Sequence, residues 1–122
     1  MKGVSIIMKT LQDYSKELRG GYDCARQGRS FTNYNPMGDD PAHFLQLREA
    51  ERTELLDWIE RRMLPRKYMN YRHTSYGLKH IYQHESGNYV SNGQFKGAMI
   101  TAGFVPDDAE ALNPSYAIRK VK

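Results

Sequence analysis

The sequence predicts a mainly α, α+β protein: a small helical domain with a helix-turn-helix-like pair and a short C-terminal β-strand or wing. Three observations carry this prediction. The length of 122 residues, with 39% hydrophobic content, is that of one domain. Two amphipathic segments with helix-start signals flank a turn within residues 74–104. The last residues, 115–122, alternate between apolar and polar side chains, as a strand does.

The N-terminal part, residues 1–40, is expected to hold one helix and a long polar loop. The helix covers 9–19, and Gly20 ends it. The apolar side chains that share its face are Leu11, Tyr14 and Leu18. The loop, 20–40, is rich in turn residues, and its length favours either a flexible segment or a surface that docks a partner. Met8 would serve as an alternative translation start.

Residues 41–122 are expected to form the compact helical domain, which begins with its longest helix. The two aspartates before Pro41 are N-cap residues, and proline suits the first helical position because it lacks an N–H. The apolar positions that follow the helical period include Phe44, Leu47, Leu55, Trp58, Ile59 and Met63. Pro65 is expected to stop this helix, and Arg66–His73 to be a linker.

The helix-turn-helix-like pair occupies residues 74–104. Thr74 or Ser75 caps the first helix, whose inward side chains are Leu78, Ile81 and Tyr82. Ser91 and Gln94 match a capping box at the start of the second helix. Its expected buried stripe is Phe95, Ala98, Met99 and Ala102. The residues expected nearer solvent are Gln94, Lys96, Gly97, Ile100 and Thr101. Gly103 should end the helix, with Phe104 packing back.

The expected terminal strand, 115–122, needs a partner. Tyr89-Val90 is the extended segment we expect beside it, which would make a small two-stranded sheet placed like a wing.

Charge is distributed in blocks along the chain. Residues 61–106 carry seven bases against one acid, and residues 37–60 carry seven acids against two bases. The bases of the first block are Arg61, Arg62, Arg66, Lys67, Arg72, Lys79 and Lys96, and its acid is Glu85. A face of one sign favours an anionic partner, either nucleic acid or an acidic protein surface. The alternative is that the two blocks neutralise each other in the fold.

A helix-turn-helix protein places the start of its second helix in the major groove. The residues predicted to lie there are Asn92, Gln94 and Lys96, and the phosphate-binding residues are Arg66, Lys67, Arg72 and Lys79. Two features speak against this motif: the connection between the helices is longer than usual, and glycines weaken the second helix. The competing interpretation is a structural helical hairpin whose lysines are solvated.

Residue patterns for catalysis or metal binding are weak. His80 and His84 lie four apart, but no zinc-ligand pattern accompanies them or His73. Cys24 is the single cysteine, so the fold cannot depend on an internal disulfide, and no nucleophile signature surrounds it. We therefore expect no enzyme activity, no metal and no cofactor. No apolar run is long enough for a membrane span, which predicts a cytoplasmic protein.

Residues 76–80 (YGLKH), 89–99 (YVSNGQFKGAM) and 103–104 (GF) resemble small uncharacterised proteins carried by bacteriophages and mobile genetic elements. The resemblance covers about residues 70–118 and implies a bacterial host cell, without any catalytic residues to transfer. It makes two functions plausible: an accessory protein that binds duplex DNA, or a small non-enzymatic inhibitor of a host defence or nucleic-acid enzyme. An assembly or structural component is a third. A reader of palindromic DNA would be a homodimer, although no heptad pattern supports one.

Overall fold

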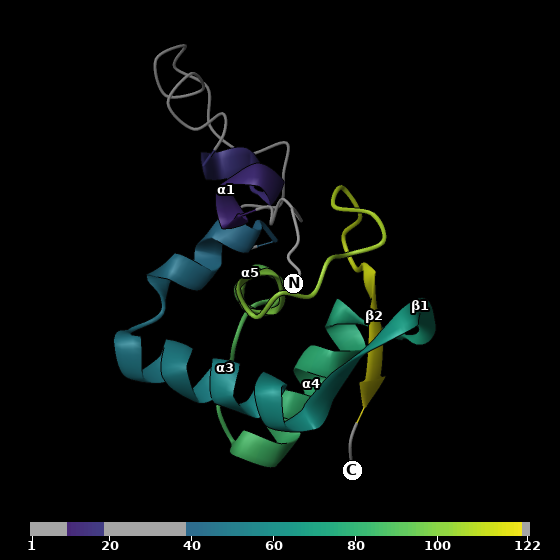
Figure 1. Ribbon diagram of the computed structural model, residues 1–122. Coiled ribbons are helices and arrows are strands. Elements are labelled where there is room, and N and C mark those ends of the chain that lie inside the picture. Colours follow the sequence, from purple (N-terminus) through teal and green to yellow (C-terminus); the bar gives the residue numbers. More distant parts are fainter. Residues whose placement is uncertain (1–9, 19–38, 121–122) are drawn as a thin grey trace, which may run out of the picture.

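The computed structural model describes residues 10–18 and 39–120 (Figure 1). In chain order the elements are α1 (Leu11–Tyr14), the 3₁₀ helix η2 (Pro41–Gln46), α3 (Glu49–Arg62), β1 (Met63–Thr74), α4 (Ser75–Ser86), α5 (Asn92–Thr101) and β2 (Ser115–Lys120). Helices combined with one two-stranded antiparallel sheet confirm the α+β class. Most of the expected loop at 20–40, together with Cys24 and Met8, lies outside the described residues.

The N-terminal helix is shorter than expected. It ends at Tyr14 because Ser15 takes an extended backbone conformation, and a second short helical stretch covers residues 16–18. The buried carboxylate of Asp40 organises this break: it accepts hydrogen bonds from the hydroxyl of Ser15 at 2.5 Å and from the backbone N–H of Glu17 at 3.0 Å. A buried carboxylate needs hydrogen-bond donors. Here Ser15 and Glu17 supply them from the point where the helix is interrupted.

The single long helix expected from Pro41 is two helices in the structure. Asp40 does cap the first, η2, by accepting a 2.8 Å hydrogen bond from the N–H of Ala42. Leu47 and Arg48 are then extended, and α3 begins only at Glu49. The break lets η2 turn onto α5, where Pro41 and Phe44 lie so close to Gly97 that an added Cβ would overlap both.

The segment expected to be a linker is strand β1, so that prediction is wrong. Helix α3 ends at Arg62, three residues before Pro65, and Met63 is already extended. Strand β2 is present as expected, but it pairs with β1 rather than with Tyr89-Val90. The paired residues include Met63 with Lys120, Pro65 with Ile118, Asn70 with Tyr116 and Thr74 with Ser115. The register shifts twice, over residues 66–69 and 71–73, and these bulges hide the two-residue period in the sequence.

Helices α4 and α5 begin and end as the sequence predicts. Thr74 caps α4 by accepting from the N–H of Gly77, and Gly87 ends it in the left-handed conformation. The capping box is confirmed: the hydroxyl of Ser91 accepts from the N–H of Gln94 at 3.1 Å, and Gln94 Oε1 accepts from the N–H of Ser91 at 2.8 Å. Five residues, 87–91, join the two helices.

Helix α5 is the central element of the described fold, and it is seen end-on in the middle of Figure 1. It contacts α1 and η2 as well as α3 and α4, so every residue from Phe95 to Ile100 is buried. The expectation that Lys96, Gly97 and Ile100 lie near solvent is therefore wrong, and Ala102, assigned to the buried stripe, is exposed. The core that surrounds α5 includes Leu55, Trp58, Leu78, Tyr82, Tyr116 and Ile118.

Candidate nucleic-acid interface

The structure divides the basic block of the sequence into three groups. The first group is neutralised: Arg61 Nε lies 2.9 Å from Asp57 on the same helix, and Arg62 Nη2 lies 2.7 Å from Glu85 at the end of α4. Glu85, the one acid in this block, also accepts a hydrogen bond from Trp58. These two arginines therefore present little free charge to a partner.

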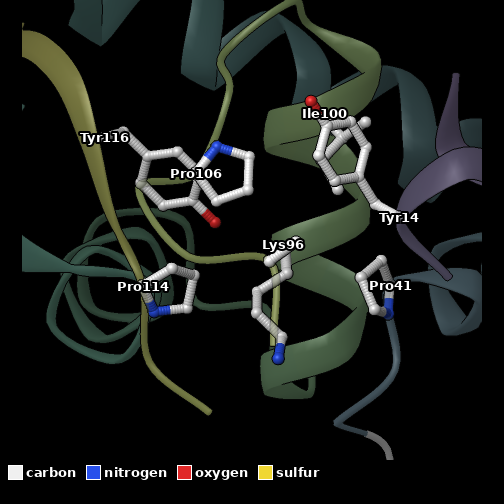
Figure 2. A pocket seen from close by; sticks show the side chains of 8 residues that line it. Tyr14, Pro41, Lys96, Ile100, Pro106, Pro114 and Tyr116 are labelled. Atoms are coloured by element: carbon white, nitrogen blue, oxygen red, sulfur yellow. The ribbon is translucent and has the colours of Figure 1, made fainter. Parts of the chain in front are cut away.

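The second group, Lys79 and Lys96, is buried. Lys79, which the sequence predicts to bind phosphate, is only 7% exposed. Lys96 is 4% exposed, and its ammonium donates to the backbone carbonyls of Leu112 at 3.1 Å and Ala111 at 3.5 Å. Figure 2 shows its side chain along α5, between Pro41 and Pro114. Burial lowers the pKa of Lys96, although the charges of Asp39 and Asp40 oppose the shift. A side chain in this position holds the 106–114 segment onto α5 and does not reach an external phosphate.

The other two residues predicted at the groove also make internal contacts. Asn92 donates to the carbonyl of Leu112 at 2.8 Å and to Asn113 Oδ1 at 2.9 Å, and its own Oδ1 accepts from the hydroxyl of Ser75. Gln94 is used by the capping box with Ser91. Asn92 thus joins the starts of α4 and α5 to the segment before β2. The side chains of Asn92, Gln94 and Lys96 are all engaged within the protein, so none of the three is free to contact the edge of a base.

The third group lies on the two-stranded sheet, at one edge of the fold (Figure 1). Strands β1 and β2 contain no aspartate or glutamate, and their charged side chains are Arg66, Lys67, Arg72, Arg119 and Lys120. All but the half-buried Lys120 are exposed. Within residues 10–18 and 39–120, none of the five forms an ion pair. We call these five residues the basic sheet surface.

Bulge geometry positions part of this surface. The Arg66 guanidinium donates to the carbonyls of Tyr68 at 2.8 Å and Met69 at 2.9 Å, which closes the first bulge of β1. Tyr68 and Tyr71 are 70% and 72% exposed, and the ammonium of Lys67 lies 5.5 Å from the centroid of the Tyr68 ring. The surface therefore combines unpaired cations with aromatic rings open to solvent.

Arg119 and Lys120 were not among the predicted site residues, since the block 107–122 is neutral in the sequence. Pairing places Arg119 opposite Leu64 and Lys120 opposite Met63, so these bases join those of β1. The sequence did show two bases at the end of an alternating segment. They could be assigned to the basic sheet surface only once the pairing of this strand with β1 was known, and the sequence did not reveal that pairing.

The histidines form no metal site in the described part of the chain, where no group of three potential metal ligands occurs. His73 lies at the second bulge of β1, and its pKa is lowered by burial and by the neighbouring charges of Lys120 and Arg72. His80 packs edge-on against Tyr76 with ring centroids 4.3 Å apart.

Comparison with known proteins adds no assignment: no family model, curated protein or solved structure matches the chain. Over the described ranges, no helix has the length and apolar character needed to cross a membrane.

Proposed function

We propose that the basic sheet surface binds nucleic acid by contacting its phosphate backbone. One observation carries the proposal: pairing of β1 with β2 gathers five cations on one small sheet without a single acid. Phosphate contacts supply most of the affinity in non-specific binding, and arginine and lysine are the residues that make them.

Duplex DNA is the expected form, and the sheet is a more suitable contact element than α5. The major groove of B-DNA accepts a two-stranded β-ribbon as well as an α-helix. In this mode the helix-turn-helix-like pair α4–α5 is a scaffold, since α5 lies inside the core and Asn92 and Gln94 make internal contacts. Tyr68 and Tyr71 would contact the sugar-phosphate backbone or stack on unpaired bases.

The test is fluorescence-anisotropy binding to random-sequence duplex DNA at about 50 mM and about 200 mM salt. The test variant is Lys67→Ala/Arg72→Ala. Its matched control, Arg48→Ala/Arg61→Ala, also removes two exposed cations, one from the N-cap position of α3 and one from its last turn. We expect the test variant to bind more weakly and to lower the slope of log affinity against log salt by about 2, whereas the control changes both much less.

Equal losses in the two variants, or no binding at the lower salt, would refute the proposal. The second outcome would direct attention to the alternative function, a small inhibitor that presents the same cations to an acidic protein surface. A complex of that kind depends on a few buried contact residues and tolerates added salt better than DNA binding does. Stable self-association without either partner would instead favour an assembly component. The bacteriophage resemblance is compatible with all three.

A further inference from the structure

An open pocket of about 260 Å³ lies between the first turns of α4 and α5, and it shares no residue with the basic sheet surface. Tyr76 and Lys79 of α4, Tyr89 of the connection, and Asp39 and Asn113 contribute to its lining. Its volume lies just below the roughly 300 Å³ at which small-ligand pockets in proteins begin. A small molecule bound here would therefore stay partly in solvent.

Lys79 is the charged centre of this pocket. The residue lines the pocket and is only 7% exposed. The ammonium lies 5.2 Å from the Tyr76 ring centroid and 5.6 Å from that of Tyr89. Over residues 10–18 and 39–120 it has no hydrogen-bond acceptor and no carboxylate within ion-pair distance. Burial lowers the pKa of Lys79, and a bound anion would oppose that effect.

The two tyrosines give the pocket aromatic walls. Tyr89 is 75% exposed. Tyr76 is held by its edge-on contact with His80, so its position is fixed from one side. The Lys79 ammonium lies over the Tyr89 ring, and the exposure of that ring leaves area beside Lys79 on which a planar group would stack.

Asp39 and Asn113 add hydrogen-bonding groups to the lining of the pocket. In the described part of the chain the Asp39 carboxylate accepts no hydrogen bond, and the Asn113 amide nitrogen donates none. Ser91 and Asn92 are already used to hold the helix starts together. The pocket therefore offers a cation for an anionic group, a ring face for a planar group, and an acceptor and a donor for the edge of that ring.

We propose that this pocket binds a nucleotide, with its phosphate on Lys79, its base stacked on Tyr89, and Asp39 accepting from a base N–H group. A nucleotide combines an anionic group, a planar ring and ring-edge donors in one molecule. A purely cationic ligand is disfavoured by Lys79, and a bare anion would leave Tyr89 unused. The proposal does not depend on binding by the basic sheet surface.

Isothermal titration with the four ribonucleoside monophosphates, and with inorganic phosphate as the comparison, tests the pocket in the full chain. We expect nucleotides to bind at least tenfold more tightly than phosphate. Tyr89→Ala should weaken nucleotide binding about tenfold, and Lys79→Met by at least as much, because each removes one of the two principal contacts. The control Val105→Ala removes an exposed apolar side chain that belongs neither to the pocket nor to the basic sheet surface, and it should leave binding unchanged.

Tyr89 is exposed, so Tyr89→Ala should keep the fold, which the fluorescence of the single tryptophan reports. Absence of nucleotide binding at millimolar concentration would refute the proposal, as would equal binding of phosphate and nucleotides. Nucleotide binding unaffected by Tyr89→Ala would also refute it. The sheet variant Lys67→Ala/Arg72→Ala should bind nucleotides normally, so failure of DNA binding and failure of this pocket are separate results.

Discussion

The indole nitrogen of Trp58 donates a 2.8 Å hydrogen bond to Oε1 of Glu85, which joins α3 to the end of α4. The Trp58 ring also packs edge-on against Tyr82 and Phe95, with centroids 5.2 and 6.3 Å away. The second oxygen of Glu85 accepts from Arg62 at 2.7 Å. One carboxylate thus satisfies the indole N–H and neutralises Arg62. Together with the ring contacts, this brings α3, α4 and α5 together around Trp58.

Glu85→Ala should lower the free energy of unfolding by about 2 kcal/mol, since it leaves the Trp58 N–H without its partner and Arg62 without its counter-charge. Urea unfolding followed by the fluorescence of Trp58 measures this loss. Glu60→Ala, which removes an exposed acid from α3, is the control and should change stability by less than about 0.5 kcal/mol. Equal effects of the two variants would contradict a structural role for Glu85.

Gly97→Ala should destabilise the fold by about 2 kcal/mol or more, because the new Cβ would overlap the carbonyl of Pro41 and the Cβ of Phe44. Both atoms belong to a packed helix and cannot move freely. The control is Gly77→Ala in α4, where an added Cβ meets nothing within 4 Å. That change should be neutral or stabilise by up to about 1 kcal/mol through helix propensity. Thermal unfolding of both variants checks the pair, and a stable Gly97→Ala would show that η2 does not pack on α5.

Lys96 should make stability depend on alkaline pH. Its folded pKa is lowered from the ordinary value of 10.5, mainly by burial, so the folded state releases this proton before the unfolded state does. The cost of burying the charge is therefore complete at neutral pH and decreases as pH rises toward 10.5.

The measurement is urea unfolding of the wild type and Lys96→Met at intervals from about pH 7 to about pH 10. The wild type should gain stability relative to Lys96→Met across this range. Comparing the two proteins cancels the titration of the other groups. A stability difference that does not vary with pH would mean that the ammonium is hydrated in the folded state.

Tyr116→Phe should be tolerated. The Tyr116 hydroxyl is buried and has no hydrogen-bond partner among the described residues, so its removal should change stability by less than about 1 kcal/mol and in the stabilising direction. Burial, with a smaller effect of Asp107, raises the pKa of this phenol. The phenol therefore ionises more readily in the unfolded state than in the folded state. As pH rises above about 10, the wild type should lose stability, and Tyr116→Phe should lose less. Urea unfolding at neutral and alkaline pH tests both points. Destabilisation by Tyr116→Phe at neutral pH would reveal a partner for the hydroxyl.

Local signals predicted local structure well. Thr74, the Ser91–Gln94 capping box and Gly103 marked helix ends because each acts through hydrogen bonds or backbone angles within a few residues. The break after η2 was missed, since it depends on how closely Pro41 and Phe44 approach Gly97, which lies on another helix. Strand β1 was missed because two bulges disrupt its alternation and its pairing with β2 spans most of the domain.

Residue type and short-range spacing were enough to predict the class of fold, the positions of α4, α5 and β2, and the excess of bases over acids between 61 and 106. Which bases remain unpaired and exposed depends instead on contacts between distant parts of the chain. Packing around α5 buries Lys96, the ion pair with Glu85 neutralises Arg62, and strand pairing adds Arg119 to the bases of β1. Burial and pairing depend on residues far apart in the chain, so the charge that a partner meets cannot be read from the order of charges along it.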